Sequence, residues 1–543
     1  MTEAKKHSYL RGVAILGSTA ILVKIIGAIY KLPLYNILDD EGAAHFQVAY
    51  QIYTLLLSIS LSGIPVALSR LVAAARATDD MRGVKRYFSV ALPAFAAVGL
   101  FFALAMFFAS DSLASLLGDG YAAAGLRALA PGVFFCCVIS VYEGYSQGFG
   151  NMGPTAAKQI LEVSFKLIAG LTIAWLLLRA GYPSPSVAAG AISGASIGLA
   201  VALPVLVLFK RRIDRADALA ALGGPGDHGG LSASRRDTLA RIFKVSIPIT
   251  LGASFMSIMT VVDTKLVLWR LEHGAGYLAS EAQALYGAYA KGQPFLQLPS
   301  ALIVPFTVSI VPAISAAVAS GRSHDAREVM ESSLKLTCLV AMPAGIGICV
   351  LARPIFVALL GQSGVGVNVL SIFGIASFFI CTQLLTTAIL QANGYERIPA
   401  FTYPIGGLIQ IAIDWALVGD RQFGILGSSF GTLACYLSIT LLNLVAIARR
   451  VKNRPRFAGA FLKPAFCTGV MGVAVFSAYH LFTRLLTRAL GTGRMTTVLC
   501  LGASVVVGAV VYLALVLLTG AITRDDLKAI PRGGRLADIL RLK

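Results

Sequence analysis

Long apolar stretches, most of them about 20 residues or more, recur from one end of this chain to the other. Only 13% of its 543 residues are charged and 57% are hydrophobic, whereas a soluble globular domain carries about 25% charged residues. A helix of about 20 apolar residues crosses the hydrocarbon core of a bilayer. The stretches are too long for the strands of a membrane barrel, which alternate over about 10 residues. The sequence therefore predicts an all-α protein that crosses the membrane many times.

The apolar stretches divide into fourteen predicted transmembrane helices, and most polar segments between them are short. The first stretch, 13–38, is too long for the apolar core of a signal peptide and lacks a small-residue cleavage site, so we expect it to be retained. The predicted ranges are 13–38, 46–74, 88–110, 125–149, 158–179, 187–209, 241–270, 283–318, 332–352, 366–392, 400–418, 425–448, 462–486 and 496–521.

Positive charge is concentrated in alternate segments between these helices. The chain carries 46 Lys and Arg residues and 26 Asp and Glu residues, for a net charge of +20. If the N-terminus lies in the cytoplasm, most of these cations fall in cytoplasmic segments, as the positive-inside rule requires. The charge therefore indicates a multi-pass topology with both termini cytoplasmic, and it does not indicate nucleic-acid binding.

Signals of catalysis and of metal binding are missing from the sequence. The eight cysteines all lie in apolar stretches, without a metal-site spacing, and the six histidines are scattered. We expect the cysteines to be small buried side chains. No phosphate-binding loop, HExxH motif or nucleophile elbow is present. The sequence predicts no catalytic residue, no metal site and no organic cofactor.

The two halves of the chain resemble each other. Segment 62–69 (SGIPVALS) corresponds to 302–309 (LIVPFTVS), and segment 147–151 (QGFGN) corresponds to 391–395 (QANGY). A six-helix repeat of this kind predicts two pseudo-symmetric lobes that enclose a central site and rock about it. The predicted parts are a first lobe of residues 1–215, a flexible cytoplasmic linker of 216–240, a second lobe of 241–450, and two further helices with a cytoplasmic tail in 451–543.

Ionisable side chains inside the predicted helices are the candidates for function, because a charge in the hydrocarbon core is costly. Cations that both lobes contribute to one cavity would suit a phosphate or pyrophosphate group, which accepts charge-assisted hydrogen bonds. The predicted substrate-binding cations are Lys24, Lys31, Arg70, Lys166, Lys265, Arg270 and Lys291.

These cations also have structural interpretations, which the sequence leaves open. Cations near a membrane interface, Arg70 among them, can extend their charge toward the lipid headgroups. Lys166 can pair with Glu162, one helical turn before it. Lys265 has Asp263 nearby and can be neutralised by it.

Two carboxylates of the second half, Asp263 and Asp414, lie in the middle of predicted helices. Two neighbouring carboxylates can hold Na⁺ together with carbonyl oxygens, or can exchange a proton. We therefore expect Asp263 and Asp414 to be candidates for a coupling-ion site for Na⁺ or H⁺. The alternative is an ion pair between Asp263 and a lysine.

Three glycines at four-residue spacing lie in the sixth predicted helix: Gly190, Gly194 and Gly198. Small residues at this spacing let two transmembrane helices approach closely. We expect this glycine stripe to pack against a neighbouring helix.

Several segments resemble one known family. They are 24–33 (KIIGAIYKLP), 49–53 (AYQIY), 62–72 (SGIPVALSRLV), 297–315 and 389–394 (ILQANG). They resemble the polysaccharide-exporter and lipid II flippase proteins, in particular the stage V sporulation protein B group. These proteins belong to the multidrug/oligosaccharidyl-lipid/polysaccharide (MOP) superfamily. The resemblance covers essentially the whole chain.

The resemblance implies two six-helix lobes facing each other in a V, plus two C-terminal helices, in a bacterial plasma membrane. It implies alternating access that flips an undecaprenyl-pyrophosphate-linked sugar outward, with cavity cations holding the pyrophosphate. Lipid II flippases use cavity arginines, whereas here lysines stand at the helix-one positions Lys24 and Lys31, and Arg70 is the nearest helix-two counterpart. Sodium is associated with acidic residues of the second lobe in some relatives.

The leading hypothesis is therefore a monomeric flippase for lipid II or a related undecaprenyl-linked glycan, with the lipid bilayer as its other partner. A MATE-type multidrug or cation antiporter is the first alternative, but such a pump is expected to line its cavity with acids. A membrane glycosyltransferase acting on the same lipids is the second, but it needs an acidic or metal-binding site in an outer loop, and these loops are short.

Overall fold

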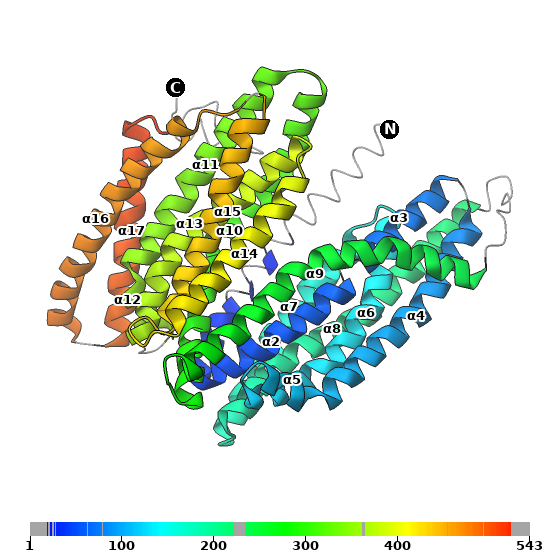
Figure 1. Cartoon of the computed structure of the whole chain (residues 1–543), viewed down its shortest axis with the longest axis horizontal. Coiled ribbons are helices and arrows are strands. Elements are labelled where there is room, and N and C mark those ends of the chain that lie inside the picture. The colour runs from blue at the N-terminus through cyan, green and yellow to red at the C-terminus, as the bar shows by residue number, and fades with distance from the viewer. Residues whose placement is uncertain are drawn as a thin grey trace. The chain divides into compact units, whose positions relative to one another are not determined.

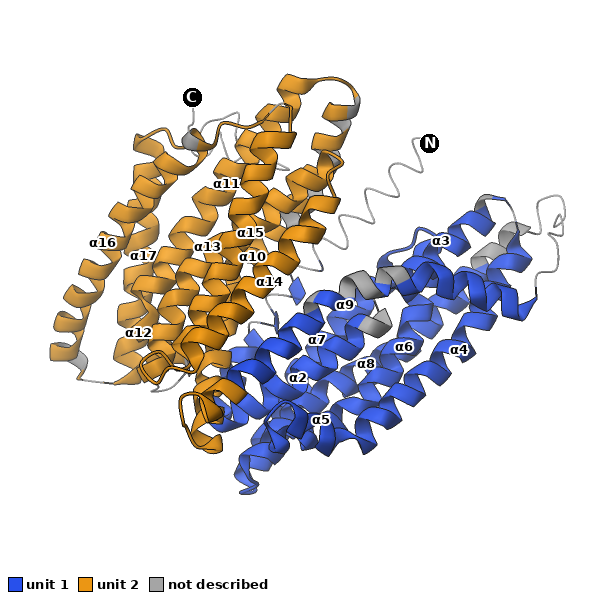
Figure 2. Ribbon diagram, viewed as in Figure 1, with its two compact units in different colours: residues 1–268 blue, residues 269–543 orange. Residues whose placement is uncertain are grey.

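The computed structural model describes Thr19 and residues 22–23, 26–27, 29–61, 63–78, 80–221, 234–360, 364–452, 454–491 and 493–522. Within these ranges every regular element is helical (Figure 1). The chain forms two compact units, unit 1 (residues 1–268) and unit 2 (residues 269–543), which are coloured separately in Figure 2. The prediction of an all-α protein is confirmed.

Unit 1 is built around α6, which packs against α2, α3, α4 and α8, while α7 packs against α8. Nearly all of the second half of α6 is buried. The helices up to the end of this unit are α2 (Asp40–Leu61), α3 (Ile64–Ala77), α4 (Met81–Phe108), α5 (Ser110–Leu116), η1 (Gly120–Ala122), α6 (Ala123–Gly148), α7 (Gly153–Arg179), α8 (Ser184–Ala221) and α9 (Arg235–His273), whose last turn belongs to unit 2.

Unit 2 is built around α13, which packs against α10, α11 and α15. Its helices are α10 (Ala279–Ala319), α11 (Ser323–Val350), α12 (Ala352–Ile355), η2 (Phe356–Leu360), α13 (Gly364–Ala392), α14 (Arg397–Val418), α15 (Leu426–Arg450), α16 (Phe457–Leu490) and α17 (Arg494–Leu518). The central helices α6 and α13 end within the two matched segments 147–151 and 391–395.

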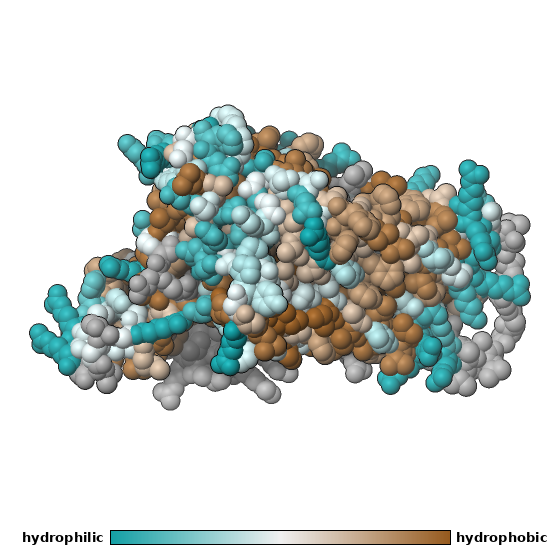
Figure 3. All heavy atoms as spheres, turned by 90° about the horizontal axis from the view of Figure 1, so that it is seen from below, coloured by the Kyte–Doolittle hydropathy of each residue, from teal (hydrophilic) through white to brown (hydrophobic). Residues whose placement is uncertain are grey.

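Ten of the described helices are long and apolar enough to cross a membrane. Their outward surfaces carry many exposed large apolar side chains, such as Phe101 and Phe466, and Figure 3 shows apolar side chains of this kind in brown across one face of the molecule. Exposed apolar surface on this scale is typical of a protein solvated by lipid. The chain is a multi-pass membrane protein; the count of fourteen spans remains a prediction.

The second predicted helix, 46–74, is in fact two helices, α2 and α3, with a break at Gly63. A Cβ atom at Gly63 would overlap the carbonyl oxygen of Ser246 and the hydroxyl of Thr250 on α9, so the chain needs a glycine at this close approach. Pro65 stands at the start of α3, where its missing N–H costs no helical hydrogen bond. The apolar run continues through the break, and for this reason hydropathy alone did not reveal it.

The glycine stripe of α8 packs against α7, as predicted. A Cβ atom at Gly194 would lie 2.6 Å from the backbone nitrogen of Gly170 and 2.9 Å from the carbonyl oxygen of Lys166. A Cβ atom at Gly198 would lie 2.6 Å from the carbonyl oxygen of Glu162. The stripe therefore fixes the stretch of α7 that carries Glu162 and Lys166.

We expect Gly194→Leu to lower the free energy of unfolding by about 2 kcal/mol or more, because the added side chain forces α8 away from α7. The matched control is Gly502→Leu on α17, where a Cβ atom meets nothing within 4 Å and the expected change is within about 0.5 kcal/mol. Unfolding of the detergent-solubilised protein by increasing SDS measures both variants. Equal stability of the two would contradict the close packing of α7 on α8.

The last two long helices are tied to the rest of unit 2 at separate points. The hydroxyl of Tyr512 on α17 donates to the carbonyl oxygen of Leu339 on α11 at 2.8 Å. At the start of α17, Arg494 Nε donates to the carbonyl oxygen of Ala358 at 2.7 Å. Ala358 lies in the π-helical segment Phe356–Leu360, and α16 packs along both α11 and α17. The pair α16–α17 is therefore an integral part of unit 2.

Candidate functional site

Charged residues follow one face of α7 at four-residue intervals: Lys158, Glu162 and Lys166. Residues four apart on a helix lie on the same face. Lys158 Nζ lies 3.0 Å from Glu162 Oε2, and the two side chains are only 9% and 21% exposed. Glu143 of α6 is buried and faces both of them. Lys158 is therefore the cation that pairs with Glu162 and interacts with Glu143.

Lys166 has a different environment from Lys158. Its Nζ atom lies 4.2 Å from the ring centroid of Tyr50 and 5.3 Å from that of Tyr30. Lys31, on the first helix, is close enough for its charge to interact with that of Lys166. Glu162 pairs with Lys158, and among the described residues no ion pair joins Glu162 to Lys166.

The pair Lys31–Lys166 brings two predicted cations together in unit 1, and both side chains are partly buried. Neither forms an ion pair with an acid among the described residues. Tyr30 is held in place by a 3.1 Å hydrogen bond from its hydroxyl to the carbonyl oxygen of Ala191. The tyrosine rings attract the Lys166 ammonium group, but two neighbouring ammonium groups repel each other. An oxyanion such as a phosphate would relieve this repulsion and accept hydrogen bonds from both.

The other predicted site residues that fall within residues 1–268 and are described by the structure lie on other helices. Arg70 is exposed on α3. Lys265 on α9 reaches Gly118, where a Cβ atom would lie 3.9 Å from its Nζ, and Asp263 is half-buried on the same helix. Lys24 lies outside the described residues, so its predicted role remains a prediction.

In unit 2, Arg270 lies over the ring of Trp415, with its guanidinium carbon 4.7 Å from the ring centroid, and it packs against Gly419. Trp269 stacks on the same Trp415 ring at 5.5 Å. These contacts favour a packing role for Arg270 at the end of α14. Lys291 on α10 is 4% exposed.

Asp414 on α14 is fully buried, and Gly431 of α15 gives it room, because a Cβ atom there would overlap the carboxylate. Asp414 belongs to unit 2 and Asp263 to unit 1, and their joint coupling-ion role remains a prediction. Within the described part of the chain, no group of three or more His, Cys, Asp and Glu side chains is placed to hold a metal ion.

Sequence reasoning missed Lys158 as a member of the charged face. The predicted helix begins at residue 158, whereas α7 begins at Gly153, so Lys158 lies one turn inside the helix and not at its start. Its four-residue spacing from Glu162 was the available signal. A second buried pair, His45 Nδ1 and Asp119 Oδ2 at 2.7 Å, joins segments that are distant in the sequence. No local sequence pattern predicts this pair.

Comparison with known proteins places this chain in a family. The family described as "Polysaccharide biosynthesis protein" matches residues 9–318. The chain is 26% identical to the uncharacterized membrane protein YabM of Bacillus subtilis, over 99% of this chain and 97% of that protein. It is 26% identical to stage V sporulation protein B of Bacillus subtilis, over 98% and 99%. It is 23% identical to lipid II flippase MurJ of Bacillus subtilis, over 81% and 82%.

Solved structures share the fold. Lipid II flippase MurJ in an inward closed conformation matches with a TM-score of 0.67 and 15% identity, over 93% of this chain and 98% of that chain. An inward-facing multidrug resistance MATE family transporter of the MOP superfamily matches with a TM-score of 0.60 and 13% identity, over 84% and 98%. The chain therefore belongs to the polysaccharide biosynthesis protein family, and it shares the fold of lipid II flippase MurJ and of a MATE family transporter.

Proposed function

We propose that this protein is a flippase for a polyprenyl-pyrophosphate-linked glycan, with lipid II or a related cell-wall precursor as its cargo. The observation that carries the proposal is the pair Lys31–Lys166, two neighbouring cations of unit 1 with no acid paired to either among the described residues. A pyrophosphate group supplies the missing negative charge. A relative named lipid II flippase MurJ supports a cargo of this class.

In this proposal the cargo moves by alternating access between two six-helix lobes arranged in a V, and α16 and α17 form the two additional helices. The ten apolar helices would then be joined by four further spans, for a total of fourteen. These four are the first helix, α2 and α3 counted as one span, α9, and α10. The distribution of Lys and Arg supports a topology with both termini in the cytoplasm.

The remaining cations would extend the binding surface. Lys24, Arg70, Lys265 and Lys291 would contact the headgroup in different conformations, whereas Arg270 contributes through its packing on Trp415. Asp263 and Asp414 would bind Na⁺ or a proton that drives the cycle. A cation-extruding antiporter fits less well, because an uncompensated cation pair repels a cationic drug.

We expect this protein to restore the appearance of lipid II in the outer leaflet of cells depleted of their own flippase. Lipid II accessible from outside is measured against total lipid II, with the empty vector as the control. The assay is run with and without an inward Na⁺ gradient, and dependence on the gradient would support the coupling-ion role of Asp263 and Asp414. If the protein reaches the membrane in normal amounts and accessible lipid II stays at the vector level, lipid II is not the cargo.

A further inference from the structure

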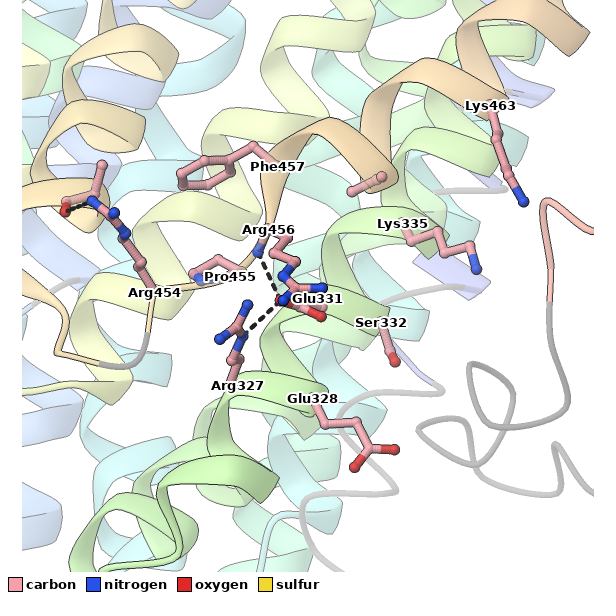
Figure 4. A pocket seen from close by; sticks show the side chains of 13 residues that line it. Arg327, Glu328, Glu331, Ser332, Lys335, Arg454, Pro455, Arg456, Phe457 and Lys463 are labelled. Atoms are coloured by element: carbon pink, nitrogen blue, oxygen red, sulfur yellow. Dashed lines mark hydrogen bonds and ion pairs between the residues drawn. The ribbon is translucent and has the colours of Figure 1, made fainter.

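A basic pocket of about 940 Å³ lies in unit 2, where α11 meets the connection from α15 to α16 (Figure 4). Five of its lining side chains are cationic and two, Glu328 and Glu331, are acidic. The cations are Arg327, Lys335, Arg454, Arg456 and Lys463. None of these residues belongs to the cation pair of unit 1, so the flippase proposal leaves this pocket without a role.

One of the two acids is already committed to protein partners. Glu331 Oε1 accepts a hydrogen bond from Arg327 Nε at 2.8 Å and another from the backbone N–H of Arg456 at 2.7 Å. Figure 4 shows Lys335 and Lys463 on one side of this group and Arg454 on the other. The side chains of Arg454, Arg456 and Lys463 are exposed. The pocket therefore keeps an excess of positive charge for an anion.

The position of the pocket indicates where that anion comes from. Two of the membrane-span candidates, Ser323–Val350 and Gly459–Arg488, begin at the pocket. Spacings of three and four residues place Phe466, Val470 and Val473 on the same face of α16 as Lys463. These three apolar side chains are 63%, 39% and 68% exposed. An apolar strip of about 15 Å therefore runs along α16 from the basic pocket into the membrane.

We propose that this pocket binds the phosphate of an anionic phospholipid, whose acyl chains lie along the exposed face of α16. Basic pockets between transmembrane helices at a membrane interface suit acidic headgroups. A free phosphate ion would use the same cations but would gain nothing from the apolar strip. The bound lipid joins α11 to the segment that connects α15 with α16.

The test is native mass spectrometry of the full-length protein in detergent, titrated with phosphatidylglycerol and with phosphatidylcholine of identical acyl chains. We expect wild-type protein to prefer phosphatidylglycerol and the Arg454→Gln/Arg456→Gln variant to bind it about 25-fold more weakly, at about fivefold per interfacial cation. Both substitutions leave the backbone hydrogen bond to Glu331 intact. The matched control, Arg449→Gln/Arg450→Gln, removes the same charge from exposed positions on α15 that do not line the pocket.

A second arm separates a lipid from a soluble anion. Phe466→Asn is expected to weaken phosphatidylglycerol binding severalfold and to leave binding of the water-soluble headgroup glycerophosphoglycerol unchanged. Binding of inorganic phosphate as tightly as phosphatidylglycerol would overturn the lipid assignment. An equal loss in the Arg449/Arg450 control would overturn the pocket itself, because net charge alone would then explain the effect. Neither measurement depends on which glycan the protein transports.

Discussion

Replacing Lys166 with Ala is expected to lower the rate of cargo translocation by about 10- to 100-fold, since a hydrogen bond to a charged group contributes about 1.5–3 kcal/mol. Lys166 lies over Tyr50 and beside Lys31, and its ammonium group has no acidic partner among the described residues. Lys31→Ala is expected to have an effect of the same size. In the proposed site both cations hold one anion, so the double variant should lose less than the product of the two single losses.

The conservative variant separates charge from packing. Lys166→Arg keeps the positive charge and should retain most of the activity, whereas Lys166→Gln should lose it. The matched control is Arg179→Ala on the same helix, because Arg179 also lies over an aromatic ring, that of Trp175 at 3.8 Å, but is exposed. Translocation is measured as lipid II accessible from outside, normalised to membrane protein level. If Lys166→Gln is as active as wild type, the cation pair does not hold the cargo.

Lys158→Ala is expected to destabilise the protein by about 3–5 kcal/mol, because it leaves the buried Glu143 and the partly buried Glu162 without their cation. Lys158 and Glu162 are 9% and 21% exposed, so water is a poor replacement for the lost partner. This substitution should lower the SDS concentration at which the protein unfolds. The double variant Lys158→Met/Glu162→Gln, which removes the pair together, should recover part of the loss.

The control for this prediction is an exposed ion pair with similar helical spacing. Arg322, the N-cap residue of α11, and Asp325 in its first turn lie 3.3 Å apart and are 62% and 51% exposed. Arg322→Ala should therefore change stability by no more than about 0.5 kcal/mol. A Lys158→Ala variant no less stable than Arg322→Ala would mean that lipid or water already solvates Glu162.

Most of the helical architecture could be predicted from the sequence because membrane helices are marked by long apolar runs. The predicted range 366–392, for example, corresponds to α13 at Gly364–Ala392. The break at Gly63 could not be predicted, because its cause is the close approach of Ser246 and Thr250 from a distant helix. Helix starts in polar segments were also missed, such as that of α7 at Gly153.

The candidate site was predictable only in its parts. Cations inside apolar runs identified Lys31 and Lys166 individually, since each is costly in lipid. Their proximity depends on how the first helix and α7 pack, and the sequence contains no signal for it. The four-residue spacing of Lys158 and Glu162 was a signal in the sequence, and in the structure Lys158 is the lysine that pairs with Glu162. The basic pocket gathers residues from α11 and α16, which are adjacent only in the folded unit.

The two hydrogen bonds that tie α17 to α11 and to the π-helical segment have a practical consequence for observing the transport cycle. A probe attached to α16 will follow unit 2 rather than swing independently. All eight native cysteines are buried or half-buried, so a single cysteine introduced at the exposed Arg488, near the end of α16, can be labelled selectively in the native background. Paired with a label on unit 1, it can be used to test by distance measurement whether the two units move during the proposed transport cycle.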